Sequence, residues 1–178
     1  MKKTILITFL FLTSCSYNYN FSKGTFIFTK NTKIGVLLFS NLSTYSNADF
    51  LVTDSITSKL SELQIKVIDS GTLTKYYSDF RSVSYNDLFK IKKISEKSNL
   101  DYLITGYVEE FGYRQSVSGV KEAPVISFYI YIYDMNTIKP VFQGFYSKSN
   151  LNNYAGTEED IIRLLKEATQ CFVKDISK

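Results

Sequence analysis

Hydrophobic and polar residues alternate most regularly between Val125 and Asp134. Successive side chains of a strand point to opposite faces of a sheet, so this alternation predicts a strand with two unlike faces. A continuous apolar run over residues 33–39 predicts a strand covered on both faces. The alternating segment has one aliphatic or phenylalanine face and one serine and tyrosine face: Ile126, Phe128, Ile130 and Ile132 against Ser127, Tyr129, Tyr131 and Tyr133.

Three other segments repeat apolar residues at helical spacing, and each follows a polar run that is typical of a helix start. These capping runs occupy residues 46–49, 84–87 and 157–160. Cys171 falls on the apolar stripe of the last helix, so it is predicted to be a core residue. The stripes are Ala48, Val52, Ile56, Leu60 and Leu63; Leu88, Ile91 and Ile94; and Ile161, Leu164, Leu165, Ala168, Cys171 and Phe172.

Strand patterns over residues 64–69, 101–113 and 141–147 complete the chain, with Gly71 ending the first and Pro140 at the edge of the last. A strand-helix-strand crossover joins parallel strands, whereas short turns join antiparallel ones. The predicted fold class is therefore α/β (α+β), with a mixed sheet of about five strands and three helices packed on it. The predicted order is β-α-β-α-β-β-β-α.

Residues 1–15 resemble a bacterial lipoprotein export signal. Two lysines precede the apolar run 5–12, which is too short to span a membrane because a spanning helix needs about 20 apolar residues. We expect a signal peptide over residues 1–14, a lipidated Cys15 and short tether over residues 15–32, and a single domain over residues 33–178. A plain secretory signal with a coincidental cysteine is the alternative.

The expected lipid on Cys15 is a diacylglycerol with an amide-linked acyl chain such as palmitate, which would hold the domain at a membrane. The residue that follows the cysteine is Ser16 and not aspartate. This resembles the arrangement that sends lipoproteins to the outer membrane, so we expect a cell-envelope protein that faces the periplasm. Lipid on one of the only two cysteines also predicts that the chain contains no disulfide.

The formal charge of +4 falls to +2 when the two lysines within residues 1–14 are removed. Nucleic-acid-binding proteins usually cluster basic residues on one face, whereas Lys90, Lys92 and Lys93 lie beside Glu96 and are interpreted as a solvated helix face. Nucleic acid is therefore not an expected partner. The apolar and aromatic fractions favour one folded domain.

The chain contains no histidine, which excludes Ser-His-Asp and Cys-His nucleophile systems and histidine-bearing zinc sites. Glu109 and Glu110 form the pair to test for carboxylate catalysis, but neighbours on a strand are expected to point to opposite faces. The acidic residues 158–160 are interpreted as helix capping and not as a metal site. The glycines lack the context of a phosphate loop. We predict no enzyme activity, metal, cofactor or small-molecule substrate.

Three sequence segments resemble a superfamily of envelope domains. They are residues 34–43 (IGVLLFSNLS), 101–108 (DYLITGYV) and 133–137 (YDMNT). The superfamily includes the amino-terminal domain of TolB, the curli-secretion lipoprotein and the activator lipoproteins of penicillin-binding proteins. The resemblance implies an α/β binding domain from residue 33 to about residue 176, with a possible accessory role in a cell-wall synthase or envelope complex.

Four features depart from this pattern. Residues 116–124 are too few for two barrel-spanning strands of about 9 to 11 residues each, which argues against a pore. The chain has no proline-rich tether of the kind that the synthase activators carry. Ile138 stands where the superfamily usually has glycine, and Leu38 where it usually has proline.

The tyrosine face of residues 129–133 has two interpretations. Tyr129, Tyr131 and Tyr133 are expected to be covered by a helix, because tyrosine is common at a sheet–helix boundary. In the other interpretation they are a docking surface, because tyrosine is enriched at the centre of interfaces.

The sequence thus predicts a membrane-anchored, non-catalytic envelope lipoprotein whose domain binds an envelope protein or assembles with itself. A carboxylate-dependent hydrolase of envelope polymers and a subunit of an outer-membrane secretion complex are the alternatives.

Overall fold

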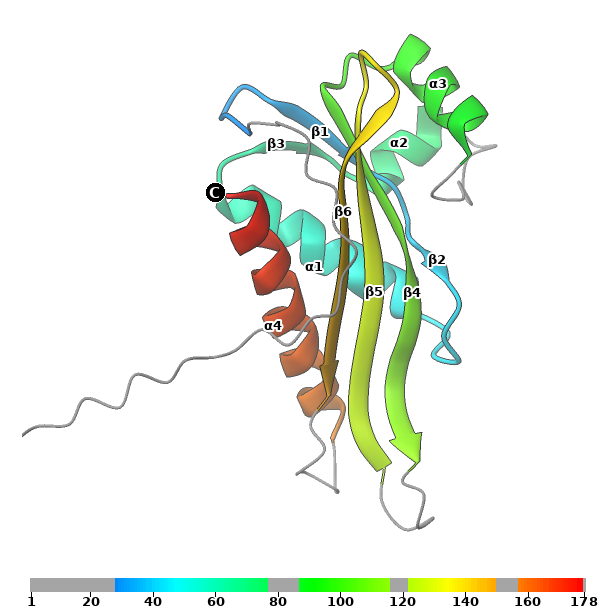
Figure 1. Cartoon of the computed structure of the whole chain (residues 1–178), viewed down its shortest axis with the longest axis vertical. Helices are drawn as coiled ribbons and strands as arrows, with labels where there is room; N and C mark the ends of the chain where they lie inside the picture. The colour runs from blue at the N-terminus through cyan, green and yellow to red at the C-terminus, as the bar shows by residue number, and fades with distance from the viewer. Residues whose placement is uncertain (1–27, 77–86, 116–121, 150–156, 178) are drawn as a thin grey trace, which may run out of the picture.

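The structure is a computed structural model that describes residues 28–76, 87–115, 122–149 and 157–177. These residues form one mixed sheet with helices packed on it (Figure 1). The predicted α/β class and mixed sheet are confirmed. The strands are β1 (Lys33–Val36), β2 (Ser40–Asn41), β3 (Lys66–Ile68), β4 (Tyr102–Gln115), β5 (Glu122–Asp134) and β6 (Lys139–Ser149), and the helices are α1 (Ala48–Glu62), α2 (Ser70–Tyr76), α3 (Leu88–Lys97) and α4 (Glu158–Ile176).

The strand order in the sheet is β3-β1-β4-β5-β6, with β2 also beside β4. β1 is parallel to β3 and β4, and β2 is parallel to β4. The long strands β4, β5 and β6 form two antiparallel pairs. This is the mixed arrangement that a crossover followed by hairpins predicts.

The aliphatic face of β5 packs against α1 and α4, which lie on the same side of the long strands (Figure 1). Where the two helices meet, Ser55 Oγ lies 3.0 Å from Thr169 Oγ1. Cys171 is 5% exposed within this core, so its predicted core position is confirmed. Among the described residues, no helix is long and apolar enough to span a bilayer.

Among the described residues, helices cover the opposite face of the sheet at one end only. α2 and α3 lie near the turn between β5 and β6, and Ser95 Oγ of α3 donates a hydrogen bond to Met135 O in that turn, at 2.6 Å. Figure 1 shows no described helix on this face beside the other end of β4 and β5. The members of the buried cluster at the covered end are Leu37, Leu73, Ile91, Ile94, Leu100, Leu103, Tyr131, Tyr133 and Met135.

The predicted strand over residues 33–39 is interrupted, which separates β1 from the unexpected β2. Leu37 N still donates to Ile104 O of β4 at 2.9 Å, but Phe39 N donates to the side chain of Thr53 in α1 at 3.1 Å. The chain pairs with β4 again at β2, where Ser40 lies opposite Tyr107, and Leu42 N donates to Val108 O at 2.9 Å. The Thr53 side chain of α1 therefore accepts the backbone hydrogen bond that a neighbouring strand would otherwise accept. The apolar run over residues 33–39 does not predict this interruption.

Helix α2 was also not expected, because Gly71 was interpreted as the end of a strand. Asp69 begins the helix instead, since its carboxylate accepts hydrogen bonds from Thr72 N at 2.7 Å and Thr72 Oγ1 at 3.2 Å. These bonds lower the pKa of Asp69, the backbone bond from Thr72 being the main cause. The sequence thus forms six strands and four helices in the described residues, against the predicted five and three.

The turn between β5 and β6 places an isoleucine in a left-handed conformation. Asp134 Oδ1 accepts hydrogen bonds from Asn136 N at 2.9 Å and Thr137 N at 2.8 Å, and Ile138 N donates to Asp134 O at 2.9 Å. Ile138 has φ 56°, a conformation that a β-branched residue rarely adopts. This is the position at which the superfamily resemblance leads one to expect glycine, and the backbone gives the reason.

Gly106 allows close packing at the centre of β4. A Cβ atom there would overlap Tyr129 O of β5 and the ring of Phe39. The ring of Phe39, which is 2% exposed, packs directly against the backbone of β4 at Gly106.

Candidate functional site

The three tyrosines of β5 do not share one environment. Tyr131 and Tyr133 are 8% and 4% exposed and belong to the buried cluster that includes Ile91 and Ile94 of α3. The helix-covered interpretation therefore holds for these two tyrosines. Tyr129 lies one step farther along the strand, is half-buried, and only borders that cluster.

Tyr129 is the middle member of a row of rings across β4, β5 and β6, which we call the aromatic row: Tyr107, Tyr129 and Phe145. Tyr107 and Phe145 are the direct cross-strand neighbours of Tyr129. The rings of Tyr107 and Tyr129 are stacked, with centroids 4.6 Å apart, and those of Tyr129 and Phe145 are 4.5 Å apart. All three side chains are half-buried, so the row keeps an accessible surface.

Tyr107 and Phe145 were not identified from the sequence as site residues. The only signal for them was strand parity, because each would face the tyrosine side of the sheet if its strand paired with β5 in this register. That register depends on hairpins whose turns the sequence does not fix closely.

A β-bulge in β4 changes the expected placement of Glu109 and Glu110. The register with β5 shifts between Val108 and Glu110, and Glu110 pairs directly with Ser127. Ser127 Oγ donates a hydrogen bond to Glu109 Oε2 at 3.2 Å. The prediction that these carboxylates point to opposite faces is therefore wrong, since the extra residue of a bulge lets both reach the Ser127 side of the sheet.

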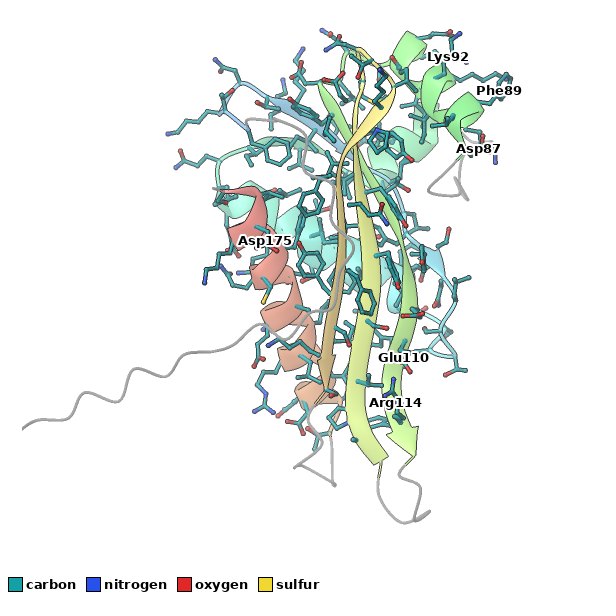
Figure 2. All side chains as sticks on the ribbon, in the orientation of Figure 1. Asp87, Phe89, Lys92, Glu110, Arg114 and Asp175 are labelled. Carbon is teal, nitrogen blue, oxygen red and sulfur yellow. The ribbon has the colours of Figure 1, made fainter. Side chains whose placement is uncertain are left out.

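Charged partners accompany this acid pair. Arg114 donates a hydrogen bond to the Glu110 carboxylate and forms an ion pair with it. The two side chains lie together toward the end of β4 (Figure 2). The hydrogen bond that Arg114 donates to Glu110 is the main cause that raises the pKa of Arg114. Burial, followed by the negative charge of Glu109, raises the pKa of Tyr129.

Residues 107, 109, 110, 129 and 145 thus form a surface on the part of the sheet that no described helix covers, and Ser127, which is 1% exposed, donates a hydrogen bond to it; we call it the hairpin surface. It combines stacked rings with carboxylates that are already hydrogen-bonded or ion-paired to neighbours. Such a surface can bury aromatic area against a partner and can exchange polar contacts at its margin.

Of the acidic residues 158–160, Asp160 caps the start of α4, while Glu158 accepts a hydrogen bond from the Tyr45 hydroxyl at 3.0 Å. Asp160 Oδ2 accepts hydrogen bonds from Thr157 N at 2.9 Å and Thr157 Oγ1 at 3.2 Å, and Arg163 donates to Asp160 Oδ1 at 2.8 Å. The backbone bond from Thr157 is the main cause that lowers the pKa of Asp160. No group of three or more metal-ligating side chains occurs among the residues that the structure describes.

The lipidation site Cys15 lies outside the described residues, as do the signal peptide and most of the tether. Cys171 is disulfide-bonded, whereas the sequence analysis predicted no disulfide. The chain has only two cysteines, and a thiol that carries lipid cannot also form a disulfide. Lipidation of Cys15 and a disulfide within the chain are therefore mutually exclusive states of the protein.

No protein-family model matches the chain, and no curated protein matches it in sequence. Solved structures do match it in fold. The chain is similar to the PelC dodecamer from Paraburkholderia phytofirmans, with 16% identity and a TM-score of 0.60 over 89% of this chain and 93% of that one. It is also similar to lipoprotein GNA1162 from Neisseria meningitidis, with 18% identity and a TM-score of 0.59 over 82% and 98% of the two chains.

A third similar structure is protein XCC0632 from Xanthomonas campestris, with 8% identity and a TM-score of 0.51 over 88% of each chain. These likenesses extend over nearly the whole length of the other chains. They show that the chain shares its fold with these proteins.

Proposed function

We propose that this protein is a lipid-anchored lipoprotein of the bacterial cell envelope whose α/β domain is a non-catalytic binding and assembly module. The observation that carries the proposal is the hairpin surface, whose half-buried aromatic row lies on the part of the sheet that no described helix covers. Aromatic side chains are enriched in interface cores, where they contribute large area at low entropy cost.

The anchor in this proposal is Cys15. The basic start, the short apolar run and the small residues before the cysteine support it, and so does the fold shared with lipoprotein GNA1162. Ser16 favours an outer-membrane position that faces the periplasm. A diacylglycerol and an amide-linked chain together bury enough methylene groups for stable attachment, at about 0.8 kcal/mol for each.

The partner in this proposal is an envelope protein or a second copy of the chain. Self-assembly is favoured by the similarity to PelC, which forms a dodecamer and matches 89% of this chain. The polar groups of the hairpin surface favour binding over catalysis, because Glu110 is ion-paired with Arg114 and Glu109 accepts a hydrogen bond from Ser127.

Photo-crosslinking in intact cells tests this proposal. A photoreactive phenylalanine derivative in place of Tyr129 should give a discrete protein adduct, whereas the same residue in place of Lys174, exposed on α4, should not. An equal yield from both positions, or no adduct at Tyr129, would contradict a docking role for the hairpin surface.

The alternative of a carboxylate-dependent hydrolase retains one supporting observation, because the bulge brings Glu109 and Glu110 to the same side of the sheet. Purified protein incubated with peptidoglycan fragments and other glycans separates the two functions. We expect no turnover. Reproducible hydrolysis that is lost in Glu109→Gln or Glu110→Gln, with the fold intact, would favour the hydrolase.

A further inference from the structure

Helix α3 exposes a large apolar surface beside several lysines. Phe89 is 68% exposed and Leu88 is 53% exposed, and Figure 2 shows Phe89 and Lys92 projecting from α3 away from the sheet. The ammonium group of Lys93, one helical turn after Phe89, lies 4.6 Å from the centroid of the Phe89 ring. An exposed phenylalanine and leucine next to each other form a small apolar patch, and the lysines beside it give the patch a charged margin.

Helix α1 carries a matching arrangement with the opposite charge. Phe50 is 54% exposed, and Asp54, one helical turn later, is also exposed. Residues four apart lie on the same side of a helix, so ring and charge are adjacent on both helices.

The formal charges of the two helices as a whole are also opposite. α1 contains three acidic residues and one lysine, a formal charge of −2, whereas residues 87–97 contain four lysines and two acidic residues, a formal charge of +2. The two surfaces are therefore complementary in charge and alike in having an aromatic anchor.

We infer that the exposed side of α3 on one copy of the chain binds the exposed side of α1 on the next copy. This inference rests on the self-assembly part of the proposed function and names the surfaces that carry it. Opposite charges would orient the contact and disfavour α1–α1 or α3–α3 pairing, while Phe50 and Phe89 bury their rings. Because two different surfaces meet, the contact is heterologous and repeats from copy to copy into a ring or a filament.

A second copy fits these observations better than an anionic membrane does. A membrane would use the lysines and apolar residues of α3, but it leaves the exposed Phe50 and the acidic side of α1 unexplained. A head-to-tail contact uses both surfaces at once. The hairpin surface does not take part, so it stays available to another envelope component.

Charge reversal and mixing test the contact. The chain from Ser16 onward contains every described helix and strand, and circular dichroism checks that it is folded before its mass in solution is measured by light scattering and native mass spectrometry. The wild-type chain should assemble, and both K92E/K93E and D54K/E62K should be monomeric under the same conditions. The control K166E/K174E, which reverses two exposed lysines of α4, should keep the wild-type mass.

Mixing the two reversed variants should restore assembly. One variant carries acidic surfaces on both helices and the other carries basic surfaces on both, so neither pairs with itself but each pairs with the other. Restoration also shows that both variants are folded.

Three results would overturn the inference. If the wild-type chain is monomeric, self-assembly fails while anchoring at Cys15 and crosslinking at Tyr129 remain testable on their own. If it assembles but either reversed variant keeps its mass, or mixing does not restore assembly, another surface carries the contact. If K92E/K93E keeps its mass and loses binding to phosphatidylglycerol vesicles, α3 binds the membrane.

Discussion

Replacing Thr53 by valine should destabilise the protein far more than the same replacement at Thr105. Thr53 is 1% exposed, and its Oγ1 accepts the hydrogen bond from Phe39 N at 3.1 Å. Phe39 is itself 2% exposed, so valine would leave its N–H buried without an acceptor. An unsatisfied buried donor costs about 1–3 kcal/mol, while the similar shape of valine keeps the packing.

Thr105 is the matched control within the same sheet. It is 0% exposed, and its Oγ1 has no hydrogen-bond partner within the described part of the chain. Valine at this position removes a buried polar atom that makes no bond, so the free energy of unfolding should stay the same or rise.

Urea denaturation and thermal melting of the two variants measure this difference. For a protein of this size each kcal/mol shifts Tm by about 2–4 °C, so Thr53→Val should lower Tm by about 2–12 °C. The two variants should have the same m-value as the parent. Equal free-energy changes at Thr53 and Thr105 would refute the role given to Thr53 in interrupting the first strand.

Three further predictions concern the tyrosines, the β5–β6 turn and acid stability. Tyr131→Ala should lower stability by about 3–5 kcal/mol in denaturation experiments, as for other buried aromatics, whereas Tyr129→Ala should cost less stability but weaken capture in a pull-down of the partner that crosslinking identifies. Ile138→Gly should be more stable than Ile138→Ala by about 1 kcal/mol or more, because both lose the side chain and only glycine adopts φ 56° without strain; the reverse order in denaturation would contradict this. The lowered pKa of Asp69 contributes stability that is present above its ordinary value of 3.8 and is lost as pH falls through the folded-state pKa, so Asp69→Asn should flatten the acid side of the stability–pH curve; an unchanged acid limb would contradict the capping role.

The sequence predicted those features that depend on local periodicity. The alternation over residues 125–134 identified β5 and its two faces, and the apolar stripes identified α1, α3 and α4. Each of these patterns is long enough for burial of one face to dominate the choice of structure.

The missing features depend on contacts between distant segments. β2 is two residues long and follows a break that Thr53 stabilises from a helix, and α2 begins at a cap that Asp69 forms next to a glycine. Glu109 and Glu110 lie on the same side of the sheet because of a bulge, and this bulge forms only when β4 pairs with β5. Tyr131 is buried and Tyr129 is half-buried because the helix-covered cluster ends between them on the sheet. The sequence of one strand does not show where the covering helices end.

The attachment of the domain to a membrane is tested most directly by the intact mass of the native protein isolated from its own cells. The proposed function predicts protein in the membrane fraction that lacks residues 1–14 and carries a diacylglycerol and an amide-linked acyl chain on Cys15. Cys15→Ala should abolish the added mass and leave the protein soluble or unprocessed. Soluble native protein that lacks residues 1–14 and carries a disulfide between its two cysteines in place of the lipid would contradict the proposal.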